Sequence, residues 1–142
     1  MCFDYGDISG SSSALYAFEK ALCDRKWWGG RVKKSLKVSL ERALLYSCMR
    51  LGYYPIDFKC SIRVFDDTGS FRQKQIDLYD KVVHPQTSAF VSLSRNTVYV
   101  IGGLASRNRM RHEFGHLLLH KLVCERHISY KVHECVAQFC EK

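Results

Sequence analysis

His112, Glu113 and His116 have the residue types and the spacing of a metal site on a helix. They form the pattern HExxH within RHEFGHLLLH, residues 111–120. Positions i and i+4 of a helix share one face, so both imidazoles can reach one Zn²⁺ at about 2.0–2.1 Å. Glu113 points beside the metal, where a carboxylate can take a proton from metal-bound water. The pattern predicts a zinc site with two histidine ligands and Glu113 as general base.

A catalytic zinc also needs a third protein ligand and an open position for water. His120 is too distant, because it lies eight residues after His112, about 12 Å along the helix axis. Glu134 is the preferred third ligand, because it falls on the next predicted helix and a turn near residues 123–128 folds that helix back. Small and apolar neighbours around position 134 are typical of a closely packed helix.

Other third ligands are compatible with the same fold. His133 is one residue from Glu134, and His127 would serve if its loop reaches inward. A closed structural site would instead use cysteine, but no cysteine spacing favours one; the candidates are Cys124, Cys135 and Cys140. Gln138 lies one turn after Glu134 and is expected to hydrogen-bond a metal-binding histidine.

The elements that must position these residues begin with two helices. Ser12 or Ser13 is expected to cap a helix to about Trp28, which Gly29-Gly30 ends. Apolar residues then recur at helical spacing from about residue 32 to 51. Residues 1–10 are expected to be irregular.

In the middle of the chain, apolar and polar residues alternate, as is typical of β-strands. Residues 56–64 have apolar side chains in one phase, and residues 66–69 are a predicted turn. The apolar residues within 71–84 follow neither the helix nor the strand period. Two strands, 89–93 and 97–101, are predicted to form a hairpin around residues 94–96.

Two more helices are predicted at the end, from about 105 to 123 and from about 129 onward. The prediction is one α+β domain over residues 1–142, with helices first, a small sheet in the middle and helices last. Residues 1–54 form its helical part, and residues 55–142 hold the sheet and the two helices of the metal site.

Composition excludes several classes of protein. The hydrophobic share of 46% and charged share of 25% are those of a globular domain. No apolar run approaches the ~20 residues of a membrane span, and the N-terminus does not resemble a secretory signal, so we expect a cytoplasmic protein without membrane contact. The seven cysteines contain no CxxC pair, so we expect them to be reduced.

The net charge of +8 is concentrated in the first half of the chain. A solvated basic helix face explains it. Attraction to nucleic acid or to an acidic protein is the functional alternative, although no nucleic-acid motif accompanies it. The residues concerned are Lys26, Arg31, Lys33, Lys34, Lys37, Arg42, Arg50 and Lys59.

The motif and its flanks resemble known families. HEFGH followed by a downstream glutamate is similar to the gluzincin branch of zinc metallopeptidases, including the 17 residues between His116 and Glu134. Residues 96–120, NTVYVIGGLASRNRMRHEFGHLLLH, resemble more narrowly the ImmA/IrrE-type metallopeptidases of bacteria and mobile elements. The resemblance implies a small zincin-like domain in which His112, His116 and Glu134 bind zinc and Glu113 is the base.

The leading functional hypothesis is therefore a zinc endopeptidase that acts on a protein or peptide, such as a regulator. Strand Thr97–Ile101 is expected to be the sheet edge along which substrate lies extended. His127 and Tyr130 are candidates to stabilise the oxyanion, and an arginine would favour acidic substrates; the arginines concerned are Arg107, Arg109 and Arg111. The alternative is a zincin-like binding or structural module without turnover. In a weaker variant, the basic half docks the protein on nucleic acid.

Overall fold

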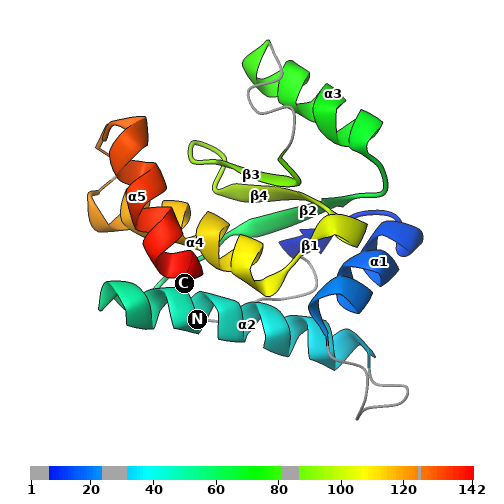
Figure 1. Cartoon of the computed structure of the whole chain (residues 1–142), viewed down its shortest axis with the longest axis horizontal. Coiled ribbons are helices and arrows are strands. Elements are labelled where there is room, and N and C mark those ends of the chain that lie inside the picture. The colour runs from blue at the N-terminus through cyan, green and yellow to red at the C-terminus, as the bar shows by residue number, and fades with distance from the viewer. Residues whose placement is uncertain (1–6, 24–31, 81–86, 125) are drawn as a thin grey trace.

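The chain folds as an α+β domain in the computed structural model, which describes residues 7–23, 32–80, 87–124 and 126–142 (Figure 1). This confirms the predicted fold class. The elements in chain order are β1 (Ile8–Ser9), α1 (Ser12–Leu22), α2 (Val32–Leu51), β2 (Ser61–Phe65), α3 (Thr68–Tyr79), β3 (Ala89–Ser92), β4 (Thr97–Ile101), the 3₁₀ turn η3 (Gly102–Leu104), α4 (Arg107–Leu122) and α5 (Tyr130–Glu141).

The sheet has the strand order β1-β2-β4-β3. β1, β2 and β4 are parallel, and β3 pairs with β4 in the antiparallel sense as the predicted hairpin. The prediction that Thr97–Ile101 forms the sheet edge is wrong, because β4 lies between β2 and β3. The edge on this side is β3, which lies beside α4 and has no further strand next to it among the described residues; the carbonyl groups of Ala89 and Val91 accept from the Thr87 and Tyr79 hydroxyls.

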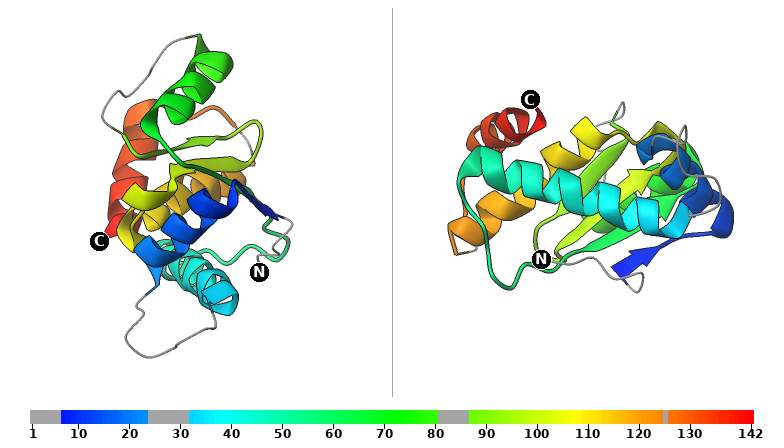
Figure 2. Two further views of the ribbon diagram at one scale, coloured as in Figure 1. Left: turned by 90° about the vertical axis from the view of Figure 1, so that its right-hand side faces the viewer. Right: turned by 90° about the horizontal axis from the view of Figure 1, so that it is seen from below.

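Helices cover both faces of the sheet. Figure 2 shows α1, α2 and α4 on one side and α3 on the other. The larger core lies on the first side and joins the sheet to α1, α2 and α4 through fully buried residues such as Phe18, Leu40 and Phe114. A smaller aromatic cluster lies under α3, where Phe71 packs against Phe90 and Phe65.

α2 supports both helices that carry the predicted metal ligands. The buried Ser47 hydroxyl donates to the carbonyl of Arg111 in α4 at 3.1 Å. The Cys140 thiol of α5 lies 4.0 Å from the Ser47 carbonyl. Arg50 donates from Nε to the Phe139 carbonyl and stacks on the Phe139 ring at 4.0 Å. The N-terminal helical part is thus the platform on which α4 and α5 rest.

Several local predictions are corrected. Ser11, rather than Ser12 or Ser13, caps α1 by accepting from the Ala14 backbone N–H. α1 ends at Leu22; its predicted continuation to residue 28 lies outside the described residues. β1 occupies residues expected to be irregular, because it adds only two residues to the edge of β2.

The strand predicted over residues 56–64 is shorter and later. β2 covers Ser61–Phe65, and Ile56 is 96% exposed, although the buried phase through Phe58, Cys60 and Ile62 is as predicted. The predicted turn at 66–69 is the start of α3, where the Asp67 side chain accepts from the Ser70 N–H and caps the helix.

No helix among the described residues is long and apolar enough to cross a bilayer. The six cysteines in the described residues are free thiols. Of the basic residues in the first half, Lys26 and Arg31 and the side chains of Lys33 and Lys34 lie outside what the structure describes.

Candidate metal centre

α4 places both histidines of the motif on the face that looks toward α5 and the sheet edge. Its N-terminus is capped by Ser106, whose hydroxyl accepts from the Arg109 N–H. The rings of His112 and His116 lie 5.0 Å apart and are buried. One helical turn therefore holds two imidazoles side by side, as the i, i+4 spacing predicted.

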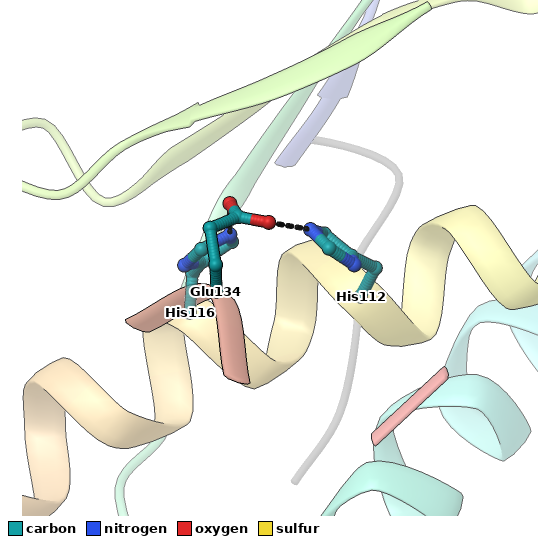
Figure 3. Close-up of side chains that lie close together, drawn as sticks. All are labelled: His112, His116 and Glu134. Atoms are coloured by element: carbon teal, nitrogen blue, oxygen red, sulfur yellow. Dashed lines mark ion pairs between the residues drawn. The ribbon is translucent and has the colours of Figure 1, made fainter. Parts of the chain in front are cut away.

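α5 brings Glu134 between the two rings (Figure 3). Its carboxylate oxygens lie 3.1 Å from His116 Nε2 and 3.5 Å from His112 Nε2. One donor atom from each of the three residues lies within 4.8 Å of the others. Glu134, rather than His133 or His127, thus completes the three-residue cluster found among the described residues.

The close approach of the two helices depends on Gly115, inside the motif. A Cβ at this position would lie 3.1 Å from Ala137 Cα and from Cys140 Cβ and Sγ. Ala137 is buried at this contact, whereas Cys135, the small residue next to Glu134, is exposed. The absent side chain of Gly115 lets α5 approach α4 closely enough to present Glu134.

The three donors are close enough together to hold one metal ion, and two of their three separations match those around zinc. Donors about 2.0–2.1 Å from one tetrahedral ion lie about 3.3 Å apart. The two nitrogen–oxygen separations of 3.1 and 3.5 Å bracket this value. Two imidazoles and one carboxylate are also a donor set that catalytic zinc sites use, with a fourth position left for water or substrate.

Each histidine also has a partner on the nitrogen that faces away from Glu134. His112 Nδ1 lies 3.0 Å from Glu141 Oε2, and His116 Nδ1 lies 3.4 Å from His133 Nδ1. An acceptor at Nδ1 holds the proton there and leaves Nε2 free to bind a metal. Both partners come from α5, so this helix supplies the third member of the cluster and orients the other two.

The predicted role of Gln138 as that partner is wrong, because Gln138 is exposed and Glu141 makes the contact. Sequence reasoning missed Glu141. Its spacing of seven residues after Glu134 puts both carboxylates on one face of a helix, and this spacing was the available signal. His133, expected as a rival ligand, is placed behind His116 instead.

Burial shifts the proton affinity of His116. The pKa of His116 is lowered to about 4, first by burial and then by the neighbouring His112. Burial also lowers the pKa of His133, with His120 adding to the effect. Both rings therefore favour the neutral form, which is the form that can bind a metal.

Glu113 lies beside the three-residue cluster and lines the same cleft, but it is not a member of the cluster. Its side chain is 4% exposed, and its Oε1 is 3.9 Å from a guanidinium nitrogen of Arg109. Burial raises the pKa of Glu113 to about 8, and Arg109 opposes this rise. A carboxyl group with a pKa near neutrality can both accept and return a proton at neutral pH.

A cleft of about 870 Å³ opens in front of these residues. β3 and the start of the β3–β4 turn line one side, and α4 lines the other with five residues that share a face: Arg109, His112, Glu113, His116 and His120. His127 and Tyr130 also line it. His120 thus lies in the cleft but outside the three-residue cluster, as its spacing predicted.

Tyr130 is the oxyanion candidate nearer to the cluster. Its hydroxyl hydrogen-bonds the Glu134 carboxylate, and its pKa is raised by burial and by the charges of Glu134 and Glu113. The hydroxyl therefore stays protonated and able to donate. His127 also faces the cleft and is exposed.

Comparisons with protein-family models, curated proteins and solved structures found no match to the chain. The case for a function therefore rests on the residues and their arrangement.

Proposed function

We propose that this protein is a zinc-dependent metallopeptidase that hydrolyses peptide bonds in a protein substrate. The observation that carries the proposal is the convergence of His112, His116 and Glu134 on one point, with Glu113 beside them in an open cleft. A metal site that served only structure would have no need of a buried carboxyl group next to its ligands. The resemblance of residues 96–120 to ImmA/IrrE-type metallopeptidases favours the same class and a protein substrate such as a regulator.

Each residue then has a defined role. His112, His116 and Glu134 would hold zinc, which when bound polarises the scissile carbonyl and lowers the pKa of water toward ~7. Glu113 accepts the proton of the attacking water and returns it to the leaving amine. Tyr130 transfers its hydroxyl hydrogen bond from the Glu134 carboxylate to the carbonyl oxygen as that oxygen gains negative charge. Glu141 and His133 hold the two imidazoles in position.

The edge strand gives the substrate a place to lie. β3 is an edge strand with no further strand beside it among the described residues, and it lines the cleft opposite α4. An extended peptide can add to such an edge through main-chain hydrogen bonds, which would carry its scissile bond past the metal cluster. This mode of binding depends on backbone and tolerates many side chains, so it suits a peptidase.

The test replaces Glu113 by Gln in the full chain and measures zinc content and peptide hydrolysis together. Glu113→Gln should bind one zinc per chain, as the unchanged protein should, and should lose hydrolysis by a factor of ~100 or more. Glu41→Gln, in the partly exposed surface of α2, is the matched control and should retain both. Zinc binding without hydrolysis by the unchanged protein would overturn the peptidase and leave a zinc-binding module. Absence of bound metal would overturn the site as well.

A further inference from the structure

We infer that Arg109 selects substrates with an acidic side chain close to the scissile bond. This inference rests on the proposed peptidase site and narrows its substrate class. Three arginines precede the motif at alternate positions, and their side chains have different surroundings in the structure.

Two of these arginines are held by contacts outside the cleft. Arg107 donates from Nε to the Leu22 carbonyl at the end of α1. Arg111 stacks on the Tyr46 ring of α2 at 3.8 Å. Only Arg109 of the three lines the cleft. It lies on the same face of α4 as His112, Glu113 and His116, at the end where the helix begins.

Arg109 keeps most of its hydrogen-bonding capacity. Its side chain is 35% exposed, and its one ion-pair contact among the described residues is to Glu113, at 3.9 Å. This separation is at the outer limit for an ion pair and too long for a hydrogen bond. A guanidinium has five donors in a planar fork that matches a carboxylate, so an incoming acidic side chain can bind to it.

The charges of the cleft favour the same ligand. Among the described residues that line it, the cations are Arg109 and Arg126, and the carboxylates are Glu113 and Glu134. Both carboxylates face the metal cluster, so a divalent ion would match their charge. The two guanidinium groups then remain uncompensated, and a cleft lined by one sign of charge attracts the opposite sign.

The helix sets the distance between this arginine and the reacting bond. Arg109 is about five residues before the midpoint of His112 and His116, or ~7.5 Å along the axis. An extended peptide advances ~3.3 Å per residue. The acidic side chain should therefore fall about two positions from the scissile bond.

The first test measures binding without turnover. Zinc-loaded Glu113→Gln protein is titrated with a fluorescent decapeptide in which Asp alternates with Thr, and with its counterpart that has Asn for Asp. The Asp peptide should bind about tenfold more tightly. This preference should shrink below about twofold in Glu113→Gln/Arg109→Gln and persist in Glu113→Gln/Arg42→Gln, because Arg42 lies exposed on α2 outside the cleft. Equal binding of the peptides, binding of neither, or a preference that survives Arg109→Gln would overturn the inference.

The second test separates this inference from the proposed function. The zinc-loaded unchanged protein digests a library of random decapeptides, and the cleaved bonds are mapped by mass spectrometry. Enrichment of Asp and Glu about two positions from the cut supports both ideas, and Arg109→Gln should abolish it. Cleavage without acidic enrichment overturns the inference and leaves the peptidase. Absence of cleavage with an intact Asp preference in binding overturns the peptidase and leaves Arg109 as an acidic-peptide contact.

Discussion

The two halves of the candidate metal centre are built differently although they share one helix turn. His112 is held by Glu141, a carboxylate whose side chain is 38% exposed, in the last turn of α5. His116 is held by His133, a buried imidazole in the first turn of α5, and the two rings stack at 5.5 Å. His112 is thus oriented by a partly exposed charged group, and His116 is oriented by a buried ring that packs against it.

The difference concerns how strongly each histidine would bind a metal. A carboxylate that accepts from Nδ1 increases the electron density on the ring and raises its strength as a ligand. A neutral imidazole does so less, but its burial fixes the ring direction without a charge. We therefore expect the His112 half to depend on electrostatics and the His116 half to depend on the contact between α4 and α5.

Gly115→Val should break both halves at once and have the largest effect. Even a Cβ at this position would lie 3.1 Å from Ala137 and Cys140, so a valine forces α5 away and displaces Glu134, Glu141 and His133 together. Zinc affinity, measured by competition with a chelator, should fall by at least about 100-fold. Gly103→Val is the control, because nothing lies within 4 Å of its Cβ position. Unchanged affinity in Gly115→Val would show that α5 does not supply the third ligand.

Glu141→Ala should break only the charged half. Loss of the acceptor at His112 Nδ1 should weaken zinc binding by about 10- to 100-fold in the same competition assay. Glu141→Gln keeps an acceptor without the charge, so its zinc affinity should lie between those of the unchanged protein and Glu141→Ala. Gln138→Ala, on an exposed position one turn earlier, should leave affinity unchanged. If Gln138→Ala weakens binding and Glu141→Ala does not, the roles of these two residues are reversed.

His133→Phe should test the buried half with a smaller effect. Phenylalanine keeps a ring against His116 and removes the acceptor, so zinc affinity should drop by roughly three- to tenfold, the value of one neutral hydrogen bond. The bound metal should stay at one per chain. Complete loss of zinc in this variant would instead identify His133 as a ligand.

The pH dependence of the stability of the metal-free protein should be the smallest effect. Two buried groups change the free energy of unfolding in opposite directions as the pH changes. The pKa of His116 is lowered to about 4, so its contribution to stability is lost as the pH falls from about 6.5 toward 4. The pKa of Glu113 is raised to about 8, so its contribution is present at low pH and lost as the pH rises from about 4.5 to 8. Between pH 4.5 and 6.5 the two slopes cancel in part.

Thermal unfolding of the unchanged protein should therefore vary little over this interval. Glu113→Gln removes one slope, so its melting temperature should fall by a few degrees as the pH drops from 6.5 to 4.5. If the melting temperatures of the two proteins change in parallel with pH, the opposing pKa shifts of His116 and Glu113 are contradicted.

The sequence predicted the elements that local pattern specifies. The long helices α2 and α4, the hairpin and the i, i+4 pair of histidines follow from periodicity alone, and the fold class was confirmed. α3 was missed because only Phe71 and Gln75 are buried along its length, which leaves too little periodicity to detect. β1 was missed because its two residues are a strand only by virtue of pairing with β2.

The parts of the site that depend on tertiary order were harder to predict. Local sequence does not specify the order of strands, so the edge was assigned to β4 rather than β3. Glu134 does lie in the three-residue cluster, because α5 folds back on α4 as predicted. Glu141 was missed because a distance of seven residues matters only once the crossing of α4 and α5 is known.

The packing of α5 on α4 has a thermodynamic consequence. Glu134, Glu141 and His133 meet the histidines of the motif only while α5 is docked. An ion that binds the docked arrangement must stabilise docking by the same free energy with which docking stabilises its binding. Bound zinc would therefore stabilise the packing of α5 against α4. Amide protons of α5 should exchange more slowly with solvent as free zinc rises, which would make metal supply a control on the lifetime of the folded chain.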